Sequence, residues 1–186
     1  MRRWTLPIAV GSLLLAVGLS PAAAAGALQL TSPEIAEGAT LTQAQVFSGF
    51  GCSGQNVSPA LSWSGAPAGT KSFALTVYDP DAPTGSGWWH WIVFDLPPTA
   101  TALPRGIGRV GKLPAGARQG RNDFGTGEFG GACPPPGDKP HRYIFTLYAL
   151  KVDTLDLPPD ASAALIGFKI HANQLAKASI TAKYGR

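Results

Sequence analysis

The sequence has few of the side chains on which hydrolytic and metal-dependent active sites are usually built. It contains three histidines, two cysteines and one methionine in 186 residues. No G-x-S-x-G, H-E-x-x-H or C-x-x-C motif occurs. These absences argue against a serine hydrolase of the nucleophile-elbow type, a zinc protease and a thioredoxin-like redox site.

The sequence also has no large excess of positive or negative charge. The chain has 15 Lys and Arg against 11 Asp and Glu, and no basic run appears. Without Arg2 and Arg3 the positive excess falls to about two. A nucleic-acid-binding domain normally shows a clear basic patch, so we expect no nucleic-acid partner.

Only one long apolar run is present, and it lies at the N-terminus. Arg2 and Arg3 precede an apolar stretch over residues 6–19, and Ala23 and Ala25 follow. This pattern is typical of a secretory signal peptide, and the run is short for a membrane anchor. We therefore expect a signal peptide over residues 1–25, a single domain over residues 26–186, and a periplasmic or secreted product. The sequence does not distinguish general secretion from twin-arginine export.

Short β-type segments dominate the rest of the chain. "KSFALTVYD", "HWIVFDL" and "HRYIFTLYAL" are rich in β-branched and aromatic residues, and "ALQLTS" is a weaker example. One helix is predicted from Asp160, as N-cap, with Leu165, Phe168, His171 and Leu175 on one face. The stretch 104–137 is mostly loop. The pattern predicts a mostly β protein, an antiparallel two-sheet sandwich with a C-terminal helix.

Two motifs match common signatures without their usual context. "GTGEFG" at residues 125–130 fits G-x-G-x-x-G but follows no apolar strand and opens no helix, so a dinucleotide site is not expected. "NVS" at residues 56–58 is a glycosylation sequon followed by Pro59, and a turn role for Asn56 is the better interpretation.

Unusual polar groups stand at the ends of the three strongest strands. Asp79 and Asp81 end the first, His90 opens the second inside "TGSGWWHW", and His141 and Tyr143 open the third. If these ends meet, imidazoles and a phenol would bind an anion, and the carboxylate would raise the histidine pKa values. The alternatives are a histidine satisfied in the core between Trp89 and Trp91, which strand spacing places on the opposite face, or a metal site. The spacing fits no standard metal pattern.

The two cysteines could form a disulfide or remain free thiols. Cys52 in "GFGCSG" and Cys133 in "GGACPPPG" both lie in turn-rich segments. In an exported protein a disulfide between them is favoured, and two free thiols are the alternative.

The segments "SFALTVYDPDAPTGSGWWHWIVFDLP" and "GGACPPPGDKPHRYIFTLYAL" closely resemble the phosphatidylethanolamine-binding protein family. Its bacterial, Raf-kinase-inhibitor-like branch is the best match, and the resemblance extends from about Leu28 to the end. It implies two antiparallel sheets with short peripheral helices and a pocket for phosphate-bearing groups. The implied ligand-binding residues are Asp79, His90, His141, Tyr143 and Pro135, with Asp81 and Trp89 as less certain members.

The resemblance thus implies an exported binding protein for phosphorylated headgroups or similar small anions, without catalytic residues, metal or cofactor. Modulation of a protein partner and formation of a homodimer are compatible with it. The rival function is a hydrolase or lyase that uses His90 or His141 as a general base.

Overall fold

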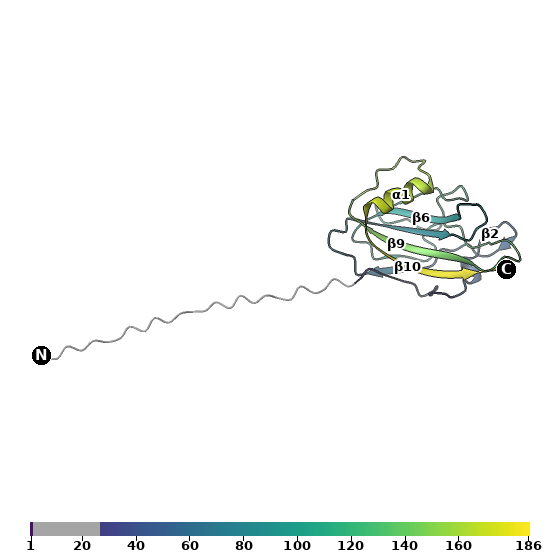
Figure 1. Cartoon of the computed structure of the whole chain (residues 1–186), viewed down its shortest axis with the longest axis horizontal. Coiled ribbons are helices and arrows are strands. Elements are labelled where there is room, and N and C mark those ends of the chain that lie inside the picture. Colours follow the sequence, from purple (N-terminus) through teal and green to yellow (C-terminus); the bar gives the residue numbers. More distant parts are fainter. Residues whose placement is uncertain (2–26) are drawn as a thin grey trace.

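The computed structural model describes residue 1 and residues 27–186 (Figure 1). The predicted signal peptide and its cleavage site lie outside the described residues. Within them, no helix has both the length and the apolar character needed to cross a membrane.

A five-stranded antiparallel sheet forms the centre of the fold, in the order β10-β9-β5-β6-β8. Its strands are β5 (Ser72–Asp79), β6 (Trp88–Leu96), β8 (Arg118–Gln119), β9 (His141–Leu150) and β10 (Gln174–Tyr184). The three strongest predicted strands are therefore confirmed and lie side by side as β9, β5 and β6. β8 is the only regular strand in the stretch 104–137, which the sequence predicted to be mostly loop.

A smaller antiparallel sheet packs against one face of the central sheet. It contains β1 (Gln29–Thr31), β4 (Leu61–Ser64) and β7 (Ala102–Leu103), in the order β1-β4-β7. Apolar side chains from both sheets, including Trp63, Phe73, Trp91 and Phe145, form one buried core between them. The predicted two-sheet sandwich is confirmed, with β2 (Ser48–Gly49) and β3 (Cys52–Ser53) as an additional hairpin and η1 (Gln43–Gln45) as a short 3-10 helix.

The other face of the central sheet is covered by α1 (Ala163–Asn173), as Figure 1 shows above β6 and β9. A second core joins the helix to Ala74, Ile92 and Phe94, and to Leu155 and Leu157 in the preceding loop. Both faces of β5 and β6 are therefore buried. The alternation in β5, expected to give a half-buried strand, instead serves two cores.

The predicted helix differs from the observed one at both ends and in its buried face. Ser162, not Asp160, is the N-cap, and its Oγ accepts a hydrogen bond from the backbone nitrogen of Leu165 at 3.2 Å. The helix buries Ala163, Ile166, Gly167 and Ile170, whereas Phe168 is exposed. Leu175 lies in β10, between Gln174 and Ala176, which pair with Leu150 and Ala149 of β9, and it is itself the extra residue at an irregularity in that pairing. Strand pairing thus overrides the helical spacing in the sequence.

The register of β5 and β6 contains an irregularity at His90. Tyr78 pairs with Trp89 and the next residue back, Val77, pairs with Trp91, so His90 is an extra residue in β6. An extra residue of this kind is a β-bulge, which changes the side on which following side chains emerge. Trp91 consequently lies in the core between the sheets, while Trp89 packs against the helix core. The expectation that Trp89 and Trp91 share one face is wrong for this reason.

Candidate functional site

The candidate site lies at the end of the central sheet where β5 ends and β6 and β9 begin. Asp79 pairs with Trp88, and Tyr78 pairs with Ile144, so the polar ends of all three strands are adjacent. A cavity of about 150 Å³ opens there. Its lining includes the predicted residues Asp79, His90, Pro135, His141 and Tyr143, together with Phe50, Ala82, Pro83, Thr84, Trp88, Phe124, Cys133 and Pro134. This volume is below the roughly 300–1,000 Å³ of pockets for drug-sized ligands, so it suits a small group.

Asp79 and His141 form a buried pair at the base of this cavity. Nδ1 of His141 donates to Oδ2 of Asp79 at 2.8 Å, and both side chains are 4% exposed. The other carboxylate oxygen of Asp79 accepts from the backbone nitrogen of Asp81 at 2.8 Å. The contacts fix the orientation of the imidazole ring and direct its Nε2 away from the sheet.

His90 is held in a different way. Nδ1 of His90 donates to the carbonyl oxygen of Gly130 at 2.8 Å, and the ring meets those of Phe124 and Tyr143 edge to face. Burial lowers the pKa of His90, and this effect outweighs the opposite influence of the Gly130 carbonyl and the Asp79 carboxylate. The expectation that the carboxylate raises the pKa of both histidines is therefore wrong for His90, because desolvation dominates.

Two buried hydrogen-bonding groups in the cavity lining have no protein partner. In the described part of the chain Nε1 of Trp88 makes no hydrogen bond, and the hydroxyl of Tyr143 donates to no acceptor, although the backbone nitrogen of Cys133 approaches the phenol oxygen. Burial also raises the pKa of Tyr143 well above its usual range, so the phenol remains a donor. Buried polar groups are nearly always satisfied, and exceptions in a cavity indicate that something else supplies the partner.

The two less certain members of the predicted site do not line the cavity. The carboxylate of Asp81 binds Arg142 through three hydrogen bonds of 2.7–2.9 Å, and Arg142 lowers the pKa of Asp81 to about 2. Asp81 belongs to a neighbouring surface groove and acts on the cavity only through its backbone bond to Asp79. Trp89 contacts the ring of Tyr78 and faces Gly167 of α1, so it is excluded from the cavity by the β-bulge.

Asp138 is a neighbour of the site that the sequence did not identify. Its Oδ2 lies 3.3 Å from Nε2 of His141, and its side chain is 43% exposed. The only available signal was its position in "PGDKPH", three residues before His141 and directly after a glycine with positive φ. A turn of this kind brings an acidic residue back toward the following strand, but the sequence does not fix its direction.

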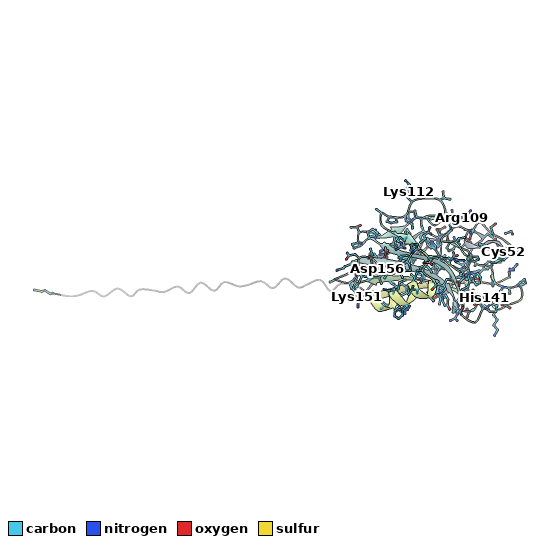
Figure 2. All side chains as sticks on the ribbon, turned by 90° about the horizontal axis from the view of Figure 1, so that it is seen from above. Cys52, Arg109, Lys112, His141, Lys151 and Asp156 are labelled. Carbon is cyan, nitrogen blue, oxygen red and sulfur yellow. A yellow bond between two sulfur atoms is a disulfide. The ribbon has the colours of Figure 1, made fainter. Side chains whose placement is uncertain are left out.

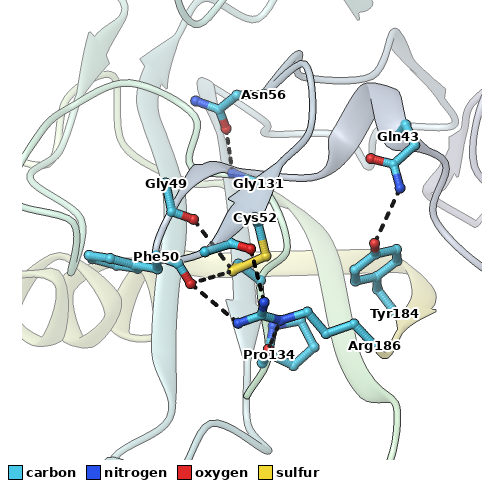
Figure 3. The surroundings of a disulfide bond; sticks show 11 residues. Gln43, Gly49, Phe50, Cys52, Asn56, Gly131, Pro134, Tyr184 and Arg186 are labelled. Atoms are coloured by element: carbon cyan, nitrogen blue, oxygen red, sulfur yellow. Dashed lines mark hydrogen bonds between the residues drawn. A yellow bond between two sulfur atoms is a disulfide. The ribbon is translucent and has the colours of Figure 1, made fainter. Parts of the chain in front are cut away.

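A disulfide and the hydrogen bonds of one arginine join the two loops that border the cavity. A disulfide joins Cys52 in the β2–β3 hairpin to Cys133 beside the cavity, which confirms the predicted pairing. The guanidinium of Arg186 donates to the carbonyl oxygens of Phe50, Gly51 and Pro134 in the same two segments (Figure 3). The C-terminal residue therefore reinforces the link that the disulfide makes.

Asn56 anchors the same wall from the opposite side. It adopts a φ of +56°, as the turn interpretation expects, and its Oδ1 accepts from the backbone nitrogen of Gly131 at 2.6 Å (Figure 3). A Cβ at Gly131 would lie 2.3 Å from the carbonyl oxygen of Gln45, so this contact requires glycine. Asn56 is buried, and this positioning role accounts for it without glycosylation.

Together, the sandwich and the small polar cavity at the end of its central sheet define a class of β-sandwich proteins with a strand-end pocket. A model of the phosphatidylethanolamine-binding protein family matches residues 31–185, and the chain belongs to that family. The UPF0098 protein YbcL of Escherichia coli K12 is 59% identical over 164 residues, which cover 87% of this chain and 90% of YbcL. A second protein of that organism, YbhB, is 49% identical over 84% of this chain and 99% of its own.

Solved structures agree with this assignment. The crystal structure of Escherichia coli YbcL, described as a new member of the mammalian PEBP family, superposes with a TM-score of 0.84 at 58% identity, covering 87% of this chain and 99% of that one. A homologue from Chlamydia trachomatis gives a TM-score of 0.72 at 32% identity, covering 86% of this chain and 98% of that one. A more distant relative is a candidate lipoprotein of Mycobacterium tuberculosis, LppC, 42% identical over 77% of this chain and 65% of its own.

Proposed function

We propose that the cavity binds a small oxyanion, such as a phosphorylated headgroup, and that the protein is an exported binding protein. The observation that carries this proposal is the pair of buried donors without partners, the Tyr143 hydroxyl and Nε1 of Trp88. Both are donors at neutral pH, and the oxygens of an anion in the cavity would supply the acceptors that they lack. A ligand of this kind would also fit the small size of the cavity.

The buried carboxylate in the cavity lining does not oppose this function. Asp79 is already engaged by Nδ1 of His141 and by the backbone nitrogen of Asp81. Nε2 of His141 is contacted only by the half-exposed Asp138, through a long 3.3 Å approach. Asp138 is itself an oxyanion, and its position supports Nε2 as a second point of contact for a ligand oxygen.

The rival function is a hydrolase or lyase that uses a histidine as general base. In the neutral form of His90, with its proton on Nδ1, Nε2 has the lone pair that a base requires. No serine or threonine side chain in the described residues hydrogen-bonds to either His90 or His141. Turnover of phosphate or carboxylate esters that is lost in His90→Ala, with binding retained, would establish the enzyme instead.

Calorimetry with methyl phosphate tests the binding function, with Tyr143→Phe as the decisive variant. Removal of a hydrogen bond to a charged ligand typically costs about 1.5–3 kcal/mol, so the Kd should rise roughly tenfold or more. The stability of the free protein should stay equal or increase, because the variant removes a buried hydroxyl that has no partner.

The matched control is His171→Ala. The His171 ring lies against Tyr148, and its Nδ1 bonds to the Gly167 carbonyl within α1, away from the cavity. Its removal should leave the Kd unchanged. Equal binding by wild type and Tyr143→Phe, or no binding of methyl phosphate at all, would refute the proposed function.

The location in the cell forms a separate part of the proposal. The N-terminal sequence and the disulfide both favour an oxidising compartment outside the cytoplasm. The intact mass of protein recovered from the cell envelope should correspond to a chain that begins at Gly26. Light scattering on the same material tests whether the protein forms a homodimer, which the sequence left open, and modulation of a partner protein stays a prediction.

A further inference from the structure

The neighbours of His90 determine which of its two ring nitrogens carries the proton. Nδ1 lies 2.8 Å from a carbonyl oxygen, which only accepts, so Nδ1 must carry a proton. The ring is buried, and burial lowers its pKa, which favours the singly protonated form at neutral pH. Nε2 then holds a lone pair, and it makes no hydrogen bond to any residue in 27–186.

The charged and titratable groups around this ring do not reverse that assignment. Asp79 on β5 and Asp123 in the loop beside β6 attract a second proton, yet the net pKa of His90 is still lowered. Tyr143 on β9 is neutral because burial raises its pKa. His141, also on β9, is engaged by Asp79.

We infer that His90 makes the cavity selective for oxyanions that retain an O–H group, such as the monoanion of a phosphate monoester, over sulfate esters of the same shape and charge. This inference rests on the proposed function and specifies its ligand. Tyr143 and Trp88 donate to the unprotonated oxygens of the ligand, while Nε2 of His90 accepts from its P–O–H group. No proton leaves the ligand, so no chemical step is involved.

The structure gives two reasons why a fully deprotonated oxyanion is rejected. Its oxygen would face the lone pair of Nε2, and the bound ligand would shield that acceptor from water without offering it a donor, which carries a substantial free-energy cost. A phosphate dianion would also place additional negative charge beside the buried Asp79 carboxylate. Sites built to bond a substrate hydroxyl reject analogues that lack it by large factors, up to about 10⁴ or more.

Methyl phosphate and methyl sulfate form a matched pair of probes for calorimetry. At pH 6 about half of a phosphate monoester is the monoanion with one O–H, since its second pKa is about 6, whereas methyl sulfate has no ionisable proton. We expect the Kd of methyl phosphate to be at least tenfold lower than that of methyl sulfate. Between pH 7 and 8 the affinity for methyl phosphate should fall nearly tenfold, while the affinity for methyl sulfate stays nearly constant.

Three outcomes distinguish this inference from the proposed function. Preference for methyl phosphate with the stated pH dependence supports both. Equal affinity for the two esters overturns the selectivity and leaves an anion pocket in place. Absence of binding by both esters overturns the proposed function, and the inference with it.

His90→Phe tests which residue is responsible for the selectivity. The aromatic ring can retain the contacts with Phe124 and Tyr143 but has no lone pair. The ratio of the two affinities should fall toward one, mainly through weaker binding of methyl phosphate. Imidazole nitrogen shifts of the wild-type protein provide a test that does not depend on the variant folding. At pH 7 they should report protonated Nδ1 and bare Nε2 in His90, and a doubly protonated ring would overturn the inference.

Discussion

The two ends of the central sheet each contain a buried aspartate, and the two residues have different roles. Asp79 ends β5, and Asp95 lies near the far end of β6; their side chains are both 4% exposed. Figure 2 labels the corresponding ends, with Cys52 and His141 on one side of the domain and Lys151 and Asp156 on the other.

Asp95 is a structural residue. It adopts a φ of +57°, and its Oδ1 accepts from the backbone nitrogen of Leu155 at 2.9 Å. This bond holds the loop that contributes Leu155 and Leu157 to the helix core. Arg118 approaches to 3.9 Å, and burial raises the pKa of Asp95 despite that cation.

At the other end of the sheet, Asp79 lines a cavity and is not covered by a packed loop. Its two oxygens each accept a hydrogen bond, whereas Asp95 accepts one, so the site with the better satisfied carboxylate is the one with the cavity. The difference lies in the neighbours, because the Tyr143 hydroxyl and Nε1 of Trp88 beside Asp79 find no acceptor among residues 27–186. A buried charge is therefore weak evidence for a binding site, and orphaned donors around a cavity are stronger evidence.

Removal of the disulfide should have the largest effect and should act at the cavity end. Cys52 and Cys133 are 81 residues apart, so Cys52→Ala with Cys133→Ala should lower the free energy of unfolding by about 4 kcal/mol in the chain-entropy model. Binding should weaken as well, because Cys133 lines the cavity and the hairpin carries Phe50. Urea denaturation and calorimetry measure the two effects. Alkylation of both cysteines in denatured, unreduced wild-type protein would contradict the disulfide itself.

Substitution of Asp95 should affect stability without affecting the cavity. Asp95→Ala loses the bond to Leu155 and places an alanine at positive φ, for a combined cost of roughly 3 kcal/mol. Asp95→Asn retains an oxygen acceptor and tolerates positive φ, so it should stay within about 1 kcal/mol of wild type. The Kd of methyl phosphate should be unchanged in both variants, and weaker binding in Asp95→Ala would contradict the separation of the two ends.

The same pair of variants also defines a pH dependence. The pKa of Asp95 is raised in the folded protein, so between the unfolded value near 3.9 and the raised value the folded state binds more protons than the unfolded state. This contribution to stability is present at low pH and decreases as the pH rises through that window. Asp95→Asn should therefore gain stability relative to wild type as the pH rises from about 4 through the raised pKa of Asp95, as measured by urea denaturation.

The sequence predicted those parts of the fold that depend on local composition. The β-branched and aromatic segments became β5, β6 and β9, and their polar ends met because antiparallel neighbours bring alternate ends together. The sandwich and the placement of Asp79, His90, His141 and Tyr143 around one cavity followed from those strands. The disulfide followed from the presence of two cysteines in a chain with an export signal.

The remaining features depend on pairing between distant segments. The bulge at His90 arises from the register of β6 against β5, and no local signal in "WWHW" separates Trp89 from Trp91. Leu175 fits a helical face, but the residues on both sides of it, Gln174 and Ala176, pair with β9. The lowered pKa of His90 results from complete burial, which a single sequence does not disclose.

The smallest predicted effect concerns Asp138, and it would sharpen the contrast between the two ends. The Asp138 carboxylate lies 3.3 Å from Nε2 of His141, where a ligand oxygen is proposed to bind, so it should compete with an added anion. Asp138→Asn removes the charge and keeps the shape, and it should tighten binding of methyl phosphate. Exposed ion pairs contribute about 0.2–1 kcal/mol, which corresponds to a gain in affinity of up to about fivefold. The gain should be smaller at high salt, because the charge is solvent-exposed.

Calorimetry at two salt concentrations measures both effects, with Asp153→Asn as the matched control, since Asp153 pairs with Lys71 at the surface. Weaker binding in Asp138→Asn would mean that Asp138 orients His141 for the ligand instead of competing with it.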